Sequence, residues 1–424
     1  SKHCSGVNDM AEQHEKALVP QIRFTGFTDP WEQRKLGELA SKRIEKNTNG
    51  IKETFTNSAE HGVVSQLDYF DHDITNDANI GNYSVVHPDD FIYNPRISAV
   101  APCGPINRNK LDRNGVMSPL YTVFSVDDTI DKLYLEHYFK TSRWHQFMFL
   151  EGNSGARSDR FSISDSIFFE MPIQCPVLEE QELIASFFGR LDSLITLHQR
   201  KYDKLCVLKK SMLDKMFPKG GSLYPEIRFA GFTDPWEQRK LEDYVVVSTA
   251  KNVDGRFNKE DVLSVSGEYG IVNQIAFQGR SFAGSSVLNY GIVNTGDIVY
   301  TKSPLNSNPY GIIKVNKGIP GIVSTLYAVY RPQDNVHTNF IQVYFEQHER
   351  MNNYMHPLVN KGAKNDMKVT AENALKGVVT FPSREEQVII SEFFDRLDSL
   401  ITLHQRKLEL LRNIKKSMLD KMFV

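Results

Sequence analysis

The feature that most constrains the fold of this chain is that several segments of its sequence occur twice. Residues 20–36 (PQIRFTGFTDPWEQRKL) recur 205 positions later with fifteen of seventeen residues identical. Residues 190–201 and 209–217 (RLDSLITLHQRK and KKSMLDKMF) recur unchanged 206 positions later. Repeats at a fixed spacing indicate a structural unit that is used more than once. At 424 residues the chain is long enough for two domains, so we predict a tandem duplication.

Between these repeats the two halves have diverged, although a shared pattern of short apolar runs remains. Pro88–Tyr93 and Gly296–Tyr300 each place a turn before such a run, and Gly115–Tyr121 corresponds in the same way to Gly321–Tyr327. β-Branched and aromatic runs bounded by Gly, Asn and Asp are typical of strands. We therefore predict two mixed α/β (α+β) globular domains that share one fold and differ in surface.

Two long helices are predicted to follow the globular domains. Apolar residues recur there every three or four positions, which is the heptad spacing of a coiled coil. About 38 residues span roughly 57 Å at 1.5 Å per residue, which is too long for burial under one domain. We therefore predict that the two helices pair as an antiparallel coiled coil. The predicted contact positions are Leu191, Leu194, His198, Leu205, Leu397, Leu400, His404 and Leu411.

The repeats and the helices together predict the order of parts along the chain. We expect Trp31 and Trp236, which recur beside a proline near the start of each domain, to pack in the two cores. The predicted parts are an N-terminal extension (1–19), a first globular domain (20–177), a first helix (178–217), a linker (218–224), a second globular domain (225–383) and a second helix (384–424).

Composition argues against several classes of protein. No run approaches the roughly 18 apolar residues that cross a membrane, and no signal-peptide pattern is present, so we expect a cytoplasmic protein. The four cysteines are scattered without a C-x-x-C pair, which favours reduced, buried thiols over disulfides or zinc. The net charge of −2 weighs mildly against a nucleic-acid binder but does not exclude a basic face.

Motifs of enzyme chemistry are missing from the sequence. We find no glycine-rich cofactor loop after a strand and no phosphate loop of the form G-x-x-x-x-G-K-[ST]. Ser307–Tyr310 (SNPY) is similar to an Asn-Pro-Pro-Tyr base clamp but lacks one proline, and we interpret it as a turn. We therefore expect no catalytic residue and no metal site in this chain.

Three motifs carry a resemblance to a known family, and each occurs in both halves. In the first half they are F-x-G-F-x-x-x-W-E-x-x-K-L at Phe24–Leu36, P-x-x-x-E-Q at Pro176–Gln181 and F-F-x-x-L-D-x-L-I at Phe187–Ile195. The order domain, helix, domain, helix, with shared helices and different domains, resembles the specificity subunits of type I restriction-modification systems. The resemblance covers nearly the whole chain.

The resemblance implies a protein that binds double-stranded DNA and is not itself an enzyme. Each globular domain would be a target recognition domain that reads one half of a bipartite, asymmetric target, and the coiled coil would separate the two. Two modification (methyltransferase) subunits and the restriction (translocase and nuclease) subunits would dock on it. Those partners would bind S-adenosylmethionine, ATP and Mg²⁺, so no cofactor and no membrane contact are expected for this chain.

Candidate DNA contacts are the polar and basic residues of loops after the shared strands and of a Gly-Ala patch in both halves. Lys and Arg bind phosphates, while Arg, Lys, Asn and Gln read base edges. Basic residues kept in both halves favour phosphate contacts, and a solvated polar loop is the alternative for each residue. The candidates are Asn94, Arg96, Asn107, Arg108, Lys110, Arg113, Arg157, Arg160, Lys302, Asn306, Asn308, Lys364 and Lys368.

Two other functions fit the same sequence. A duplicated coiled-coil scaffold that joins two protein-binding domains would show no salt-dependent affinity for DNA, whereas a DNA-binding subunit would lose affinity as salt rises. A stand-alone DNA-modifying enzyme would need the cofactor and base-clamp motifs that the sequence lacks.

Overall fold

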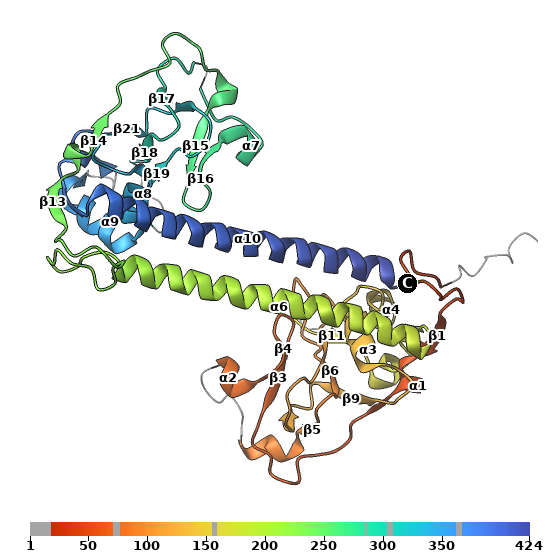
Figure 1. The fold of residues 1–424 in the computed structure, drawn as a ribbon. Coiled ribbons are helices and arrows are strands. Elements are labelled where there is room, and N and C mark those ends of the chain that lie inside the picture. The colour runs from red at the N-terminus through yellow and green to blue at the C-terminus, as the bar shows by residue number, and fades with distance from the viewer. Residues whose placement is uncertain (1–17, 71–76, 155–158, 285, 303–307, 362–366) are drawn as a thin grey trace, which may run out of the picture. The chain divides into compact units, whose positions relative to one another are not determined.

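The computed structural model describes residues 18–70, 77–154, 159–284, 286–302, 308–361 and 367–424. The chain divides into two compact units (Figure 1). Unit 1 contains the chain up to His198 together with Lys407–Val424, and unit 2 contains Gln199–Arg406. Unlike the predicted partition, in which the helices are separate parts, each unit combines one globular domain with a segment of both long helices.

The globular domain of unit 1 is built on a four-stranded antiparallel sheet with short paired strands around it. The sheet has the order β2 (Ala40–Lys42), β9 (Thr122–Val126), β6 (Phe91–Tyr93), β7 (Ile106–Arg108). The paired strands are β1 (Glu32–Lys35) with β12 (Pro172–Cys175), β3 (Phe55–Ser58) with β4 (Gly62–Ser65), β5 (Ser84–Val86) with β8 (Gly115–Met117), and β10 (Asn153–Ser154) with β11 (Phe161–Ser162). The short helices are α1 (Leu36–Leu39), α2 (Gln66–Phe70), η1 (Asp77–Asn82), α3 (Lys132–Tyr138), α4 (His145–Glu151) and α5 (Asp165–Phe168).

The globular domain of unit 2 repeats this plan. Its sheet has the order β14 (Val245–Val247), β21 (Ala328–Pro332), β18 (Ile298–Tyr300), β19 (Ile313–Val315). The paired strands are β13 (Glu237–Lys240) with β24 (Val378–Phe381), β15 (Leu263–Ser266) with β16 (Gly270–Asn273), β17 (Gly291–Val293) with β20 (Gly321–Val323), and β22 (Asn360–Lys361) with β23 (Met367–Lys368). The short helices are η2 (Leu241–Asp243), η3 (Lys259–Asp261), α7 (Gln274–Gln278), α8 (Thr338–Glu346), α9 (His348–Met355), η4 (His356–Leu358) and η5 (Asn373–Leu375).

The matching sheet orders confirm that the two globular domains share a mixed α/β fold. The predicted apolar runs at Phe91–Tyr93 and Ile298–Tyr300 are the inner strands β6 and β18, and all their residues are buried. Short β-branched and aromatic runs become strands here because both faces of each strand are covered by apolar side chains. The duplication is therefore visible in strand order even where the sequences differ.

The long helices α6 (Leu178–Lys215) and α10 (Arg384–Met422) pack on each other in both units. In unit 1, Leu411 and Met418 of α10 pack against the core that contains Leu191 of α6. In unit 2 the opposite ends meet, since the later part of α6 packs against the beginning of α10. The end of one helix thus lies beside the start of the other, which confirms the antiparallel pair.

An ion pair between the helices occurs once in each unit. Lys415 lies 2.5 Å from Asp192 in unit 1, and Lys209 lies 2.5 Å from Asp398 in unit 2. Both aspartates come from the repeat RLDSLITLHQRK and both lysines from the repeat KKSMLDKMF. The two repeated segments therefore supply the two sides of one contact that is made twice.

Two of the predicted helix contact positions are wrong. Leu194 and Leu400 are each 44% exposed. The contact face instead continues through Ile195 and Ile401, which are half-buried. The other predicted contact positions are buried or half-buried, namely Leu191, His198, Leu205, Leu397, His404 and Leu411.

The end of each long helix closes the core of one domain. Phe423 packs edge-to-face on Trp31 in unit 1 with ring centroids 6.3 Å apart, and Phe217 packs on Trp236 in unit 2 at 5.9 Å. The tryptophans are 3% and 1% exposed, which confirms that both lie in the cores. The predicted extension reaches into this region as well, since the Leu18 carbonyl accepts the Trp31 N–H at 2.9 Å.

Candidate nucleic-acid interface

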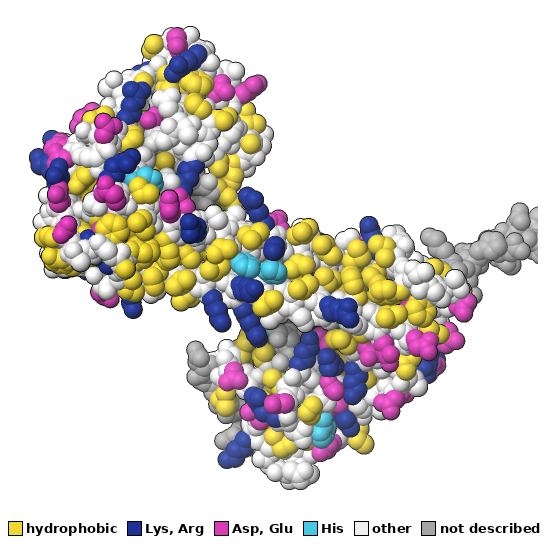
Figure 2. Space-filling model, in the orientation of Figure 1, with side chains coloured by type: hydrophobic (Ala, Val, Ile, Leu, Met, Phe, Trp, Pro, Cys, Tyr) yellow, Lys and Arg dark blue, Asp and Glu magenta, His cyan; other side chains and the backbone are white. Residues whose placement is uncertain are grey.

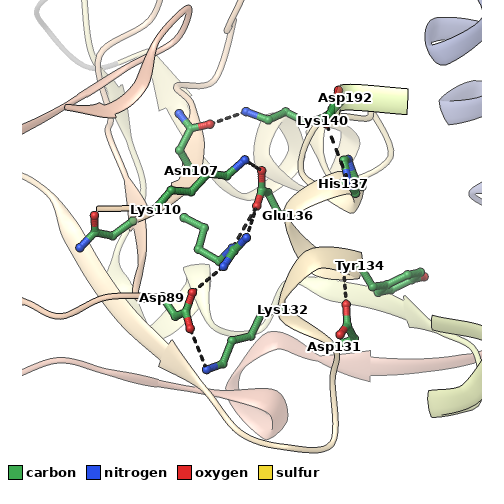
Figure 3. Close-up of polar contacts among 12 residues, drawn as sticks. Asp89, Asn107, Lys110, Asp131, Lys132, Tyr134, Glu136, His137, Lys140 and Asp192 are labelled. Carbon is green, nitrogen blue, oxygen red and sulfur yellow. Dashed lines mark hydrogen bonds and ion pairs between the residues drawn. The ribbon is translucent and has the colours of Figure 1, made fainter. Parts of the chain in front are cut away.

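Two predicted asparagine contacts hold the first domain together. Asn107 on β7 is only 4% exposed, donates its amide to Asn57 Oδ1 at 2.7 Å and accepts from the Lys140 ammonium (Figure 3). Asn94 donates to the Asn57 carbonyl at 2.8 Å and is half-buried. The polar atoms of Asn107 are bonded inside the domain, and as a DNA contact Asn107 stays a prediction. Asn94 stays a prediction.

Arg108 and Lys110 converge on one buried carboxylate (Figure 3). The Glu136 side chain is 5% exposed, binds Arg108 at 2.9 Å and pairs with Lys110, while Arg108 also reaches Asp89 at 2.5 Å. Burial by itself raises the pKa of Glu136, but the hydrogen bond and charge of Lys110, with those of Arg108, outweigh burial and lower the pKa below its usual value. Both cations are thus already neutralised, and as DNA contacts they stay predictions.

The structure brings two predicted stretches of the first domain together. The backbones of Arg96 and Arg160 form an isolated antiparallel bridge. The Arg96 side chain is 71% exposed and lies 3.7 Å from Asp159, and that of Arg113 is 46% exposed and lies 3.1 Å from Glu53. These arginines are accessible, so they remain candidates for binding an anionic partner.

In the second domain, Lys302 lies two residues after the end of β18 and has a left-handed backbone with φ of 52°. A lysine adopts this conformation rarely, and burial lowers its pKa. Asn308 begins a turn in which its carbonyl accepts the Gly311 N–H at 3.0 Å, as predicted for this segment. The candidates Arg157, Asn306 and Lys364 lie outside the described residues, as does the side chain of Lys368 on β23.

Comparison with known proteins identifies a family with this architecture. The model of the type I restriction modification DNA specificity domain matches residues 28–206 and, a second time, residues 233–413. The chain belongs to this family. The two matches confirm the resemblance inferred from the motifs and give one type I specificity domain to each half of the duplication.

Relatives of this type I specificity protein are distant in sequence. The putative type I restriction enzyme MjaX specificity subunit of Methanocaldococcus jannaschii is 22% identical over 306 residues. That alignment covers 68% of this chain and 65% of the relative, so it spans less than two thirds of the relative's length.

Two solved structures are similar to it as well. The S subunit of a type I restriction-modification system from M. genitalium has a TM-score of 0.55 at 14% identity and covers 96% of this chain and 99% of that chain. The HsdS subunit from Thermoanaerobacter tengcongensis has a TM-score of 0.42 at 16% identity, with 94% and 98% covered. The first of these matches shows that the fold is shared.

The two type I specificity domains differ in chemistry at equivalent positions. Strand β7 corresponds to β19, so that the buried Asn107 is matched by Lys314, which is 8% exposed. Lys140 after α3 is matched by Glu346 in α8, which binds Lys209 at 2.6 Å. One fold therefore carries different polar groups in the two halves.

Sequence reasoning missed one repeated set of basic residues. Lys46, Lys52, Lys251 and Lys259 are exposed, and they flank corresponding loops of the two domains. The signal that finds Lys46 and Lys251 is the pattern K-N-x-[ND]-G, which recurs 205 positions apart inside the diverged halves, and Lys52 and Lys259 follow it at different distances. Short repeats of this kind are easily overlooked beside longer ones.

Two further observations concern the potential metal ligands and the cysteines of the described residues. Within those ranges no group of three or more His, Cys, Asp and Glu side chains could hold a metal ion, and no helix is both long and apolar enough to span a membrane. Cys103 and Cys175 are buried as predicted, and burial raises the pKa of each thiol to about 12. Cys206 is only half-buried, and Cys4 lies outside the described residues.

Proposed function

We propose that this chain is the DNA-recognition subunit of a type I restriction-modification complex and that it reads a bipartite, asymmetric target. The observation that carries the proposal is the contrast between the repeated and the diverged parts. The repeated segments make the same contacts twice, whereas the two domains share a strand order and differ in polar groups at matching positions. Two readers of one fold with different surfaces suit two different half-sites.

The exposed faces of the long helices support docking of two copies of one partner. Leu194 and Leu197 of α6 are 44% and 46% exposed, and the equivalent Leu400 and Leu403 of α10 are 44% and 45% exposed. Hydrophobic side chains also gather along the helices in Figure 2. Exposed apolar residues that recur at equal positions favour a protein interface. We assign these faces to two modification subunits.

In this proposal the chemistry takes place in the partner subunits. The modification subunits bind S-adenosylmethionine and methylate the target, while the restriction subunits bind ATP and Mg²⁺ and cleave DNA. This chain supplies sequence recognition and the docking faces, and it acts where the DNA is, in the cytoplasm.

The test is methylation of a DNA library by this chain coexpressed with its modification subunits, followed by mapping of the methylated sites. We expect a single two-part motif with a fixed spacer between its halves. The rival reading, a coiled-coil scaffold without DNA specificity, predicts no sequence-specific methylation by a folded complex and no fall in DNA affinity as salt rises.

A further inference from the structure

A short loop recurs inside the two diverged domains. The two copies run from Lys46 to Lys52 and from Lys251 to Lys259, and we call them the clamped loops. They begin with KNTNG and KNVDG, and each ends with a lysine that is followed by glutamate. Each loop is attached to the same neighbouring strand, because the backbone of its first lysine bridges to the start of β5 or of β17.

The asparagine of this pattern is a structural residue. Asn47 and Asn252 are 4% and 0% exposed. The side-chain oxygen of each accepts an N–H from the far side of its own loop, from Ile51 at 2.8 Å and from Phe257 at 3.0 Å. Their amides donate back to the same two residues, both at 2.8 Å. The glycines have left-handed φ angles of 68° and 67°, which glycine adopts without strain.

The lysines have no comparable part in the fold. Lys46, Lys52, Lys251 and Lys259 are all exposed, and their ammonium groups make no hydrogen bond or ion pair within the described ranges. An exposed side chain without such contacts contributes little to stability. Lys46 and Lys251 are kept at equivalent positions in domains that otherwise diverged, and each loop has a second lysine, Lys52 or Lys259, near its other end. Exposed cations in the same loop of both domains point to a partner whose chemistry is the same for both domains.

We infer that the clamped loops bind phosphates of the DNA backbone, two lysines to each loop. The inference rests on the proposed function and adds to it the residues that position the DNA. Two readers of different half-sites meet different bases but the same phosphate chain. A lysine ammonium acts as a point charge that suits a phosphate, and the asparagine clamp holds the two ends of each loop close together.

Acidic residues lie next to both clamped loops. Glu53 follows the first loop and is engaged by Arg113 at 3.1 Å, and Glu260 follows the second loop. Glu45 precedes the first loop and lies 2.8 Å from His87, while the second loop also contains Asp254 and Arg256 and is followed by Asp261. Within the described residues none of these carboxylates forms an ion pair with a lysine of the loops. Since the whole chain has a net charge of −2, unpaired lysines are the places where a polyanion is attracted.

The experiment uses the full chain in complex with its modification subunits. The variants are Lys46→Gln with Lys52→Gln for the first loop and Lys251→Gln with Lys259→Gln for the second. Binding to a target duplex and to a scrambled duplex is measured over a range of salt concentrations. Each lost phosphate contact is expected to reduce the slope of log affinity against log salt by about 0.9, so by about 1.8 for each loop.

Complexes with these lysine variants are expected to bind both duplexes more weakly. They are expected to methylate the same motif as the unaltered complex. The matched control is Lys35→Gln with Lys240→Gln, which removes two exposed lysines that are paired with Glu170 and Glu242. The control is expected to leave the slope unchanged, although it alters the net charge equally. Circular dichroism checks that each variant is folded.

Three results overturn the inference and leave the proposed function standing. They are an unchanged salt slope, a changed motif at one half-site, which would mean base readout, and weaker binding of the modification subunits with normal DNA binding. If the unaltered complex shows no sequence-specific, salt-dependent binding, the proposed function itself fails. The two failures are therefore distinguishable.

Discussion

At the scale of residues, the recurring E-Q pair ties the start of each long helix to its domain. The Glu180 carboxylate binds the Arg23 guanidinium through two hydrogen bonds of 2.7 and 2.8 Å. Gln181 donates to the Pro176 carbonyl at 2.9 Å and accepts the Asp131 N–H at 2.8 Å. The hydrogen bond with Glu180 raises the pKa of Arg23 despite its burial. The same bidentate pair recurs between Arg228 and Glu386.

Replacing Glu180 by glutamine is expected to destabilise unit 1 by about 3 kcal/mol, because the Arg23 charge is left buried without a counter-charge. Hydrogen exchange read separately at α3 and α8 measures the effect in the two units. The matched control is Glu170→Gln, which removes a partner of the exposed Lys35 and should leave α3 protection as it was. Equal loss of protection from hydrogen exchange in both variants would contradict this account of the Arg23–Glu180 pair.

His137 is a buried histidine whose titration should weaken unit 1 in acid. It is 1% exposed, and neither ring nitrogen has a hydrogen-bond partner within the described structure. Burial, together with the charge of Lys415, lowers the pKa of His137 to about 4, although Asp192 lies 4.0 Å away. The unfolded imidazole has a pKa near 6.5, so between pH 6.5 and 4 the unfolded chain binds more protons. Stability is therefore full above pH 6.5 and falls as the pH drops through this window.

The variant that tests this titration is His137→Val, because Val343 occupies the equivalent position in unit 2. Its unfolding free energy should fall less than that of the unaltered chain between pH 6.5 and 4, by on the order of 3 kcal/mol at most. Urea unfolding at a series of pH values measures the difference. His61→Val, at an exposed site, serves as the control, and parallel pH profiles for all three proteins would count against His137.

At the scale of elements, each long helix has two different apolar faces. One face pairs with the other helix, through residues such as Leu191 and Leu397, which are 8% and 6% exposed. The second face carries the exposed leucines of the same repeat. A repeated segment that must serve both an internal contact and a partner has few positions free to vary, which accounts for the identity of the two copies.

Leu197→Glu is expected to remove one of the two modification subunits, and Leu197→Glu with Leu403→Glu to remove both. A buried carboxylate without a partner is costly at an apolar interface, whereas on the free chain this leucine is 46% exposed and its replacement should leave the fold intact. Native mass spectrometry of the complex gives the stoichiometry. The control is Val207→Glu, at a 69% exposed position of α6 outside the repeated segments, and two bound subunits in every variant would refute the assignment.

At the scale of the whole molecule, the antiparallel helix pair predicts how the two half-sites relate. The contact between the repeats is made once in each unit, with the roles of α6 and α10 exchanged, so both units are built in the same way on an antiparallel helix pair. Two identical domains in such an arrangement should read two identical half-sites in inverted orientation.

Modification subunits bound to a chain in which residues 242–383 are replaced by residues 37–177 should therefore methylate a palindromic target with the original spacer. The exchange is feasible because the repeated segments before and after each domain are nearly identical in the two halves. The spacing between the copies is 205 residues before the domains and 206 residues after them. Mapping of methylated sites tests it, with the unaltered chain as control. A direct rather than an inverted repeat of the half-site would contradict this prediction.

Much of the architecture was predictable from local patterns. The repeats can be recognised by comparing the sequence with itself. The spacing of apolar residues in a helix of this length can be recognised without knowing which element the helix packs against. Trp31 and Trp236 were predictable as core residues because a large aromatic side chain has few other stable places. The phase of the helix contact was not, since steps of three and four are both compatible with a helix, and only packing selected Ile195 over Leu194.

The candidate interface depended more on tertiary structure. In sequence, Asn107, Arg108 and Lys110 are polar residues near the end of a strand, and only the folded domain brings Asn57 and Glu136 to them from distant positions and satisfies their polar groups. The same folding leaves the ammonium groups of the clamped loops without an ion pair among the residues that the structure describes. The sequence by itself determined the duplication, the helices and the family, because these rest on local order along the chain. Which charges remain available for another molecule was decided only by the tertiary structure, because neutralisation depends on contacts between residues far apart in sequence.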